Sequence, residues 1–135
     1  MLKTLLKYID IEFDGDNITG MNCARFAEHF RRQEYGRETP LAIPSYAECI
    51  DDLEAIFDFN IENGIYKETK TPVDGDLFLM SNRAFGKWHH LGVYLNKGAI
   101  HCTEHAGNRA GVQWCPVERI GRLFPYYTAY TEKDG

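Results

Sequence analysis

The hydrophobic pattern of this 135-residue chain changes its period near residue 61. Before that point apolar side chains recur at helical spacing, with Phe26, Ala27 and Phe30 on one face, and residues 2–8 suit a further short helix. After it, the pattern takes the two-residue period of strands. Helices first and antiparallel strands afterwards predict an α+β fold, in which the helices pack on one face of a sheet.

Two of the expected helices carry end signals. Asn22 is a good N-cap for a helix over 23–35, and Gly36 is a residue type that commonly ends one. Ser45 and Glu48 form an S-x-x-E capping box for the next helix. Its apolar stripe comprises Tyr46, Cys49, Ile50, Leu53, Ile56 and Phe57.

Six strand-like runs follow residue 61. They read GIYKET, DLFLM, HLGVYL, AIHCTEH, VQWCPV and YYTAYT. Turn signals rich in Gly, Pro and Asn separate several of them, at residues 72–75, 96–98 and 107–108. We expect an antiparallel meander, in which strands adjacent in sequence pair.

Length and composition bound the class of protein. With 44% hydrophobic and 26% charged residues and no linker or repeat, residues 1–135 are expected to form one globular domain. A net charge of −5 without a dense basic stripe argues against nucleic-acid binding. No run is long enough to span a membrane. Lys7 and Asp10 interrupt the apolar start of the chain, so we expect no signal peptide and synthesis in the cytoplasm.

The four cysteines lie at positions 23, 49, 102 and 115, without CxxC pairing. An even number permits disulfides, but without a secretion signal free thiols are the better expectation. Cys49 lies on an apolar helical stripe and Cys102 on the strand face opposite His101, so both are predicted to be core residues.

Cys23 differs because it lies in the first turn of a predicted helix. The helix dipole and the unpaired N–H groups there favour a thiolate and can stabilise an oxyanion beside it. The stretch HHLGVYLNKGAIHC places His90 and His101 near the two ends of a predicted hairpin. Either these rings are solvated surface residues, or they converge on Cys23 as base and orienting residue.

Three segments together resemble the NlpC-type cell-wall peptidases, which are papain-like cysteine endopeptidases. They read DGDNITGMNCARFAEHF, DGDLFLM and HHLGVYLNKGAIHC, and the resemblance spans about residues 8–117. It implies a papain-like α+β fold with Cys23 as nucleophile, His90 as general base and His101 as third, orienting residue. The chain length and the segment EYGRETP are similar to the versions found in phage tails.

The resemblance also implies an activity. Such a peptidase cleaves the γ-D-glutamyl–diamino acid bond of peptidoglycan stem peptides and needs no cofactor or metal. The implied partners are the stem peptide and phage-tail proteins, and the implied place of action is the cell wall, reached as part of a phage particle.

Departures from the family pattern motivate an alternative. Arg25 stands where the family usually has Gly, and the turn between the histidines is one residue shorter. A two-residue or four-residue loop would put both rings on one face of the hairpin, whereas a three-residue Asn-Lys-Gly loop with a bulge would put them on opposite faces. The alternative is a catalytically silent module of the same fold that binds peptidoglycan or tail proteins.

A zinc site is a further alternative, suggested by the HCTEH stretch. His101 and His105 share one face of an extended strand but lie about 13 Å apart along it, which is too far for one metal ion. We therefore expect no bound metal to be needed for folding or activity.

Overall fold

The computed structural model describes residues 2–14, 20–39, 53–81, 90–106, 109–124 and 126–132. The helices are α1 (Leu2–Tyr8), α2 (Cys23–Tyr35), α3 (Leu53–Glu62) and α4 (Val117–Leu123). The strands are β1 (Tyr66–Thr69), β2 (Leu77–Ser81), β3 (His90–Leu95), β4 (Gly98–Ala106), β5 (Arg109–Pro116) and β6 (Tyr126–Glu132). The predicted α+β class is confirmed.

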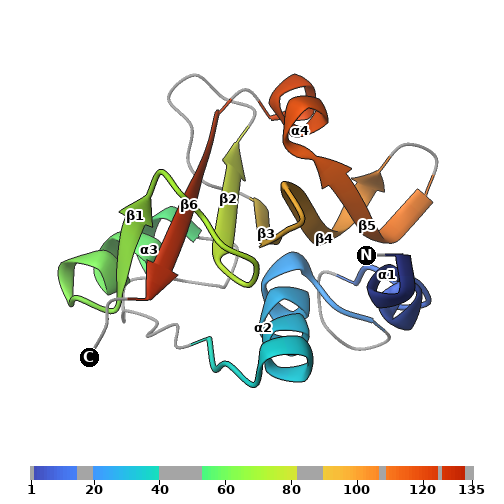
Figure 1. The fold of residues 1–135 in the computed structure, drawn as a ribbon, viewed down its shortest axis with the longest axis horizontal. Helices are drawn as coiled ribbons and strands as arrows, with labels where there is room; N and C mark the ends of the chain where they lie inside the picture. Colours follow the sequence, from blue (N-terminus) through green and yellow to red (C-terminus); the bar gives the residue numbers. More distant parts are fainter. Residues whose placement is uncertain are drawn as a thin grey trace.

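The strands form one six-stranded antiparallel sheet in the order β1-β6-β2-β3-β4-β5 (Figure 1). The predicted meander is confirmed from β2 to β5. It is wrong for β6, which lies between β1 and β2. The physical reason is burial on both faces: Ala129 and Tyr130 are consecutive yet both buried, so β6 suits the interior of the sheet better than an edge.

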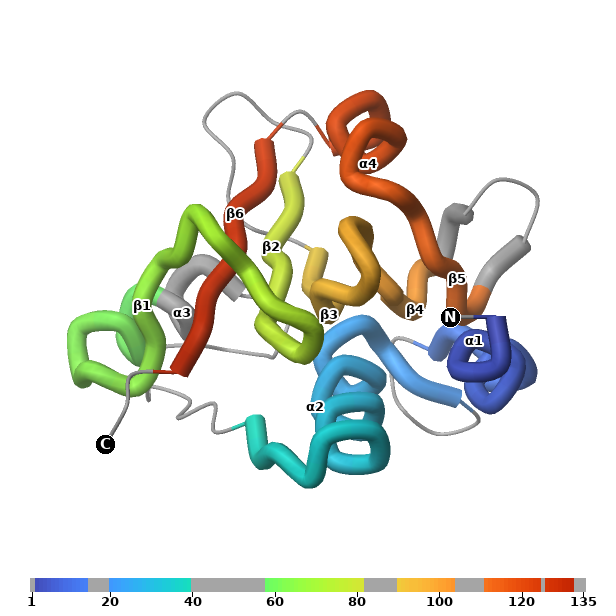
Figure 2. The backbone as a smooth tube through the Cα atoms, viewed as in Figure 1, coloured from blue at the N-terminus to red at the C-terminus, as the bar shows by residue number. Residues whose placement is uncertain are grey.

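The sheet separates two apolar cores. Phe26 and Phe30 of α2 pack on the face that carries Leu91 and Val93. Ile120 of α4 packs on the other face, together with Phe78, Met80, Ala99, Cys115 and Ala129. In Figures 1 and 2, α2 and α4 lie on opposite sides of β3 and β4. The expectation that helices cover one face is therefore wrong for α4, which buries Ile120 against the second face.

Helix α2 has the predicted ends. The Asn22 side chain accepts a hydrogen bond from the Arg25 N–H at 2.8 Å, and Gly36 adopts a left-handed conformation with φ of 60°. Cys23 is consequently the first residue of α2. The capping box predicted for the next helix, Ser45 and Glu48, lies outside the described residues, as does Cys49. The later part of that predicted helix is observed as α3.

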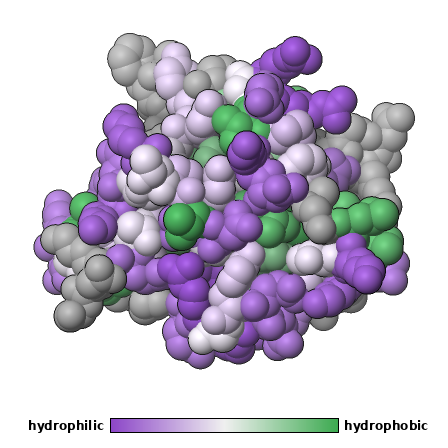
Figure 3. All heavy atoms as spheres, viewed as in Figure 1, coloured by the Kyte–Doolittle hydropathy of each residue, from purple (hydrophilic) through white to green (hydrophobic). Residues whose placement is uncertain are grey.

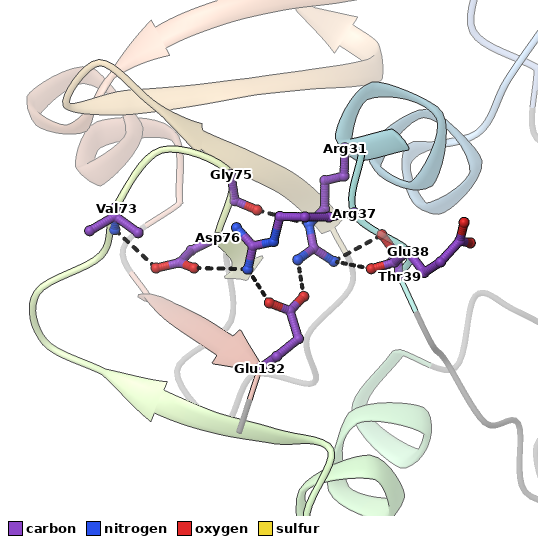
Figure 4. Close-up of polar contacts among 8 residues, drawn as sticks. All are labelled: Arg31, Arg37, Glu38, Thr39, Val73, Gly75, Asp76 and Glu132. Carbon is purple, nitrogen blue, oxygen red and sulfur yellow. Dashed lines mark hydrogen bonds and ion pairs between the residues drawn. The ribbon is translucent and has the colours of Figure 1, made fainter. Parts of the chain in front are cut away.

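A buried arginine ties α2 to the sheet (Figure 4). The Arg31 side chain is fully buried, and its Nε donates to the Gly75 carbonyl at 2.8 Å, in the turn that leads into β2. Its Nη2 contacts the Glu132 carboxylate at the end of β6, which Arg37 contacts as well. Arg37 also lies 3.6 Å from an Asp76 carboxylate oxygen. These contacts connect one helix to two strands.

The described residues on the face drawn in Figure 3 are mostly hydrophilic. Figure 3 shows hydrophobic side chains gathered over α1, where Leu2 and Leu6 are exposed. In the part of the chain that the structure describes, no helix is long and apolar enough to cross a membrane.

Removal of Arg31 should destabilise the fold strongly. Arg31→Ala leaves the Gly75 carbonyl without its buried donor and weakens the neutralisation of Glu132, for a loss of about 3 kcal/mol in the free energy of unfolding. Arg32→Ala is the matched control on the same helix: Arg32 is half exposed and pairs with exposed Glu38, so its loss should be below about 1 kcal/mol. Urea unfolding measures both, and equal losses would contradict the assignment.

Candidate active site

The hairpin of β3 and β4 turns through two residues. Asn96 and Lys97 both have positive φ, 49° and 61°, and Leu95 pairs with Gly98. This is the conformation of a type I′ turn. The two-residue alternative is thus the one observed. A larger residue does not fit at position 98, because a Cβ there would lie 2.4 Å from the Cys115 carbonyl oxygen.

This turn places His90 and His101 on one face and in contact. His90 Nε2 lies 2.6 Å from His101 Nδ1, so one nitrogen donates a hydrogen bond to the other. Both residues are buried, with exposed fractions of 7% and 4%. Gly92 makes room for them, because a Cβ at Gly92 would lie 3.2 Å from the His101 Cβ. The structure therefore shows two of the predicted site residues, His90 and His101, in direct contact.

Burial governs the charge of the second ring. It lowers the pKa of His101 to about 4, because the imidazolium would lose its hydration. His101 is therefore neutral at neutral pH. A neutral His101 can accept the Nε2–H of His90 through Nδ1, also when His90 carries a positive charge.

An aromatic residue that the sequence analysis did not identify completes the surroundings of His90. The ring of Phe124 is stacked on the His90 imidazole, with centroids 5.4 Å apart and planes at 11°. Phe124 is the C-cap residue of α4. The sequence analysis did not predict this helix, although Val117, Ile120 and Phe124 have the i, i+3, i+7 spacing of one helical face and could have indicated it.

The pleat of the sheet determines which way the rings project. His90 pairs with Met80, which belongs to the core beneath α4, whereas Leu91 belongs to the core beneath α2. The rings therefore lie on the α4 side. Cys23 heads α2 and packs against the other core, which contains Cys102. The pairing of Cys23 with His90 stays a prediction, and the experiments below test it.

The architecture matches solved structures of cell-wall hydrolases. One is the NlpC/p60 domain of the peptidoglycan hydrolase SagA, with a TM-score of 0.50 and 18% identity, covering 95% of this chain and 93% of that chain. Another is an N-acetylmuramoyl-L-alanine amidase from Bacteroides uniformis ATCC 8492, with a TM-score of 0.59, 10% identity and 98% of each chain covered. The fold is that of an NlpC/p60 domain. No protein-family model and no curated protein matches the sequence.

Within this NlpC/p60 fold the described thiols differ in their surroundings. Cys102 is a core residue, as predicted, and burial together with the nearby Cys23 raises its pKa to about 12. Its Sγ donates to the Met21 carbonyl at 3.3 Å. Burial also raises the pKa of Cys115. Cys23 is only half buried and lies at a helix N-terminus.

The zinc alternative gains no support. Among the described residues, no group of three or more His, Cys, Asp or Glu side chains could hold a metal ion. The side chain of His105, which that alternative needs, lies outside the described part of the chain.

Stability should depend on pH through His101. Its folded pKa of about 4 lies below the ordinary 6.5, so the unfolded chain binds more protons between these values. The contribution is fully present above pH 6.5 and is lost as the pH falls towards 4, by about 3 kcal/mol at most. Chemical unfolding across this range should show a shallower loss for His101→Gln than for wild type. Identical slopes for wild type and His101→Gln would refute the assignment.

Cys23 should be the most reactive of the described thiols. A helix N-terminus favours its thiolate, whereas burial keeps Cys102 and Cys115 protonated. Iodoacetamide at neutral pH, followed by peptide mass mapping, should modify Cys23 first. Uniform labelling, or faster labelling of Cys102, would contradict this expectation.

Proposed function

We propose that the protein is a peptidoglycan hydrolase that works as a cysteine endopeptidase on stem peptides, at the γ-D-glutamyl–diamino acid bond. The observation that carries the proposal is the buried hydrogen bond between His90 and His101. In an NlpC/p60 fold whose α2 begins at Cys23, such a pair is what a base and its orienting residue require.

Under this proposal each ring nitrogen of His90 has its own task. Nε2 is engaged with His101, so Nδ1 is the atom that would bond the thiol of Cys23. His90 takes the thiol proton, and the thiolate attacks the scissile carbonyl. N–H groups in the first turn of α2 stabilise the oxyanion. His90 then protonates the leaving amine, and water hydrolyses the thioester.

His101 supports this cycle without entering the bond changes. Because its pKa is about 4, it stays neutral and does not repel the imidazolium of His90. Its Nδ1 accepts the Nε2–H and thereby stabilises the charged ring in one orientation. We assign no cofactor or metal to the reaction.

We further propose that the protein acts on the cell wall as part of a phage tail. The support is the similarity of the segment at residues 34–40 to phage-tail versions of the family. Tail proteins would then be its partners besides the stem peptide.

A silent binding module is the second candidate. One observation favours it: Arg25, whose side chain is 56% exposed, lies two residues after Cys23, where the family usually has Gly. Such a module would bind peptidoglycan or tail proteins without cleaving them.

Substitution of the candidate nucleophile and base should abolish hydrolysis. Cys23→Ala removes the attacking sulfur, and His90→Ala removes the group that takes and returns the proton. Each should lower kcat by about 10⁴-fold or more, and the double variant should be no worse because the two act as one unit. His101→Ala should be milder, since it removes only the partner of His90. Chromatography of stem peptides after digestion measures the cleavage.

Controls separate chemistry from folding. Cys115→Ala, in the α4 core, should keep its activity, and circular dichroism should show native spectra for every variant. A wild-type protein that cleaves no stem peptide yet sediments with purified sacculi would replace the peptidase with the binding module. Full activity of His101→Ala would reduce the site to Cys23 and His90.

A further inference from the structure

Phe124 contacts the candidate base from outside the hairpin. Its ring lies nearly parallel to the His90 imidazole, at 11° with 5.4 Å between centroids. The His101 ring meets the same imidazole at 75°, with 4.8 Å between centroids. One face of the His90 imidazole thus lies against the Phe124 ring, and its Nε2 edge is directed towards His101.

These contacts restrict the same motion. Rotation of His90 about its Cβ–Cγ bond would carry Nε2 away from His101 Nδ1 and would turn the imidazole edge into the Phe124 ring. A flat ring in parallel contact therefore selects the rotamer in which the 2.6 Å hydrogen bond forms.

Phe124 is itself held by the core rather than by a free loop. Its backbone N–H donates to the Ile120 carbonyl at 2.7 Å, at the end of α4. Ile120 is 1% exposed and packs among Phe78, Met80 and Ala99 on this face of the sheet. The position of the Phe124 ring is therefore set by the docking of α4.

We propose that Phe124 is a positioning residue for His90: its ring fixes the imidazole plane so that Nε2 stays on His101 and Nδ1 is presented for proton transfer. The contribution of Phe124 to catalysis rests on the proposed function, whereas its effect on the orientation of the histidine pair does not. The proposal connects α4, which the family resemblance did not include, to the state of the candidate base.

Tyr127 offers a matched control. It is opposite Met80 on the neighbouring strand and so lies on the same face as His90. Its ring stacks on Phe78, with centroids 5.3 Å apart and planes at 23°. Tyr127→Leu therefore removes an equivalent aromatic stack near the site without removing one from an imidazole.

The decisive experiment is nitrogen NMR of the histidine rings, in a chain with only five histidines. Single His→Gln variants assign the signals. In wild type, His90 and His101 should each show the shifts of one dominant tautomer. Phe124→Leu should move the His90 shifts towards the average of both tautomers, Phe124→Tyr should restore the wild-type shifts, and Tyr127→Leu should leave them unchanged. If Phe124→Leu does not fold, Phe124→Met provides the same loss of a flat ring.

The activity arm uses the same variants on stem peptides. Phe124→Leu should lower kcat about tenfold with KM little changed, because a misplaced base costs rate rather than binding, and Phe124→Tyr should recover most of it. Unchanged histidine shifts in Phe124→Leu, or equal effects of Phe124→Leu and Tyr127→Leu, would overturn the proposal. A wild type without hydrolysis would defeat the proposed function alone, since the NMR comparison decides the role of Phe124 independently.

Discussion

The two-residue turn at Asn96 and Lys97 is the constraint on which the candidate site depends. It sets the register of β3 against β4, and side chains alternate faces along each strand. One residue more in this turn would move His101 to the face that Cys102 occupies and would break its bond to His90. Lys97 accepts an unfavourable positive φ because the strands beyond the turn are held by close packing, with Gly98 against Trp114 and Cys115.

The candidate catalytic groups come from both layers of the fold. Cys23 begins a helix that Arg31 anchors on one side of the sheet, whereas the histidine pair and Phe124 lie with α4 on the other. Under the proposed function, activity would require both layers to be docked correctly. The stabilities of the Arg31 and Phe124 variants would then report on separate halves of one site.

Burial of His101 illustrates how stability and function oppose one another. A solvent-exposed histidine would not lower the free energy of unfolding at low pH, whereas the buried His101 destabilises the fold as the pH falls. The same burial provides a neutral acceptor beside His90 at neutral pH. Strained or costly residues of this kind are expected at functional sites and are compensated elsewhere, here by the apolar cores on both faces of the sheet.

The sequence by itself determined the features that depend on local signals. Asn22 and Gly36 delimit α2, so Cys23 falls at a helix start, and short apolar and aromatic runs between turn signals indicate the strands. The tertiary structure alone decided the length of the hairpin turn, the place of β6 inside the sheet, the face on which α4 docks and the stack on His90. Each of these follows from contacts between residues far apart in the chain, which local periodicity does not encode. Gly98, directly after the two-residue turn, packs closely against β5, and Phe124 reaches His90 because α4 docks on the sheet.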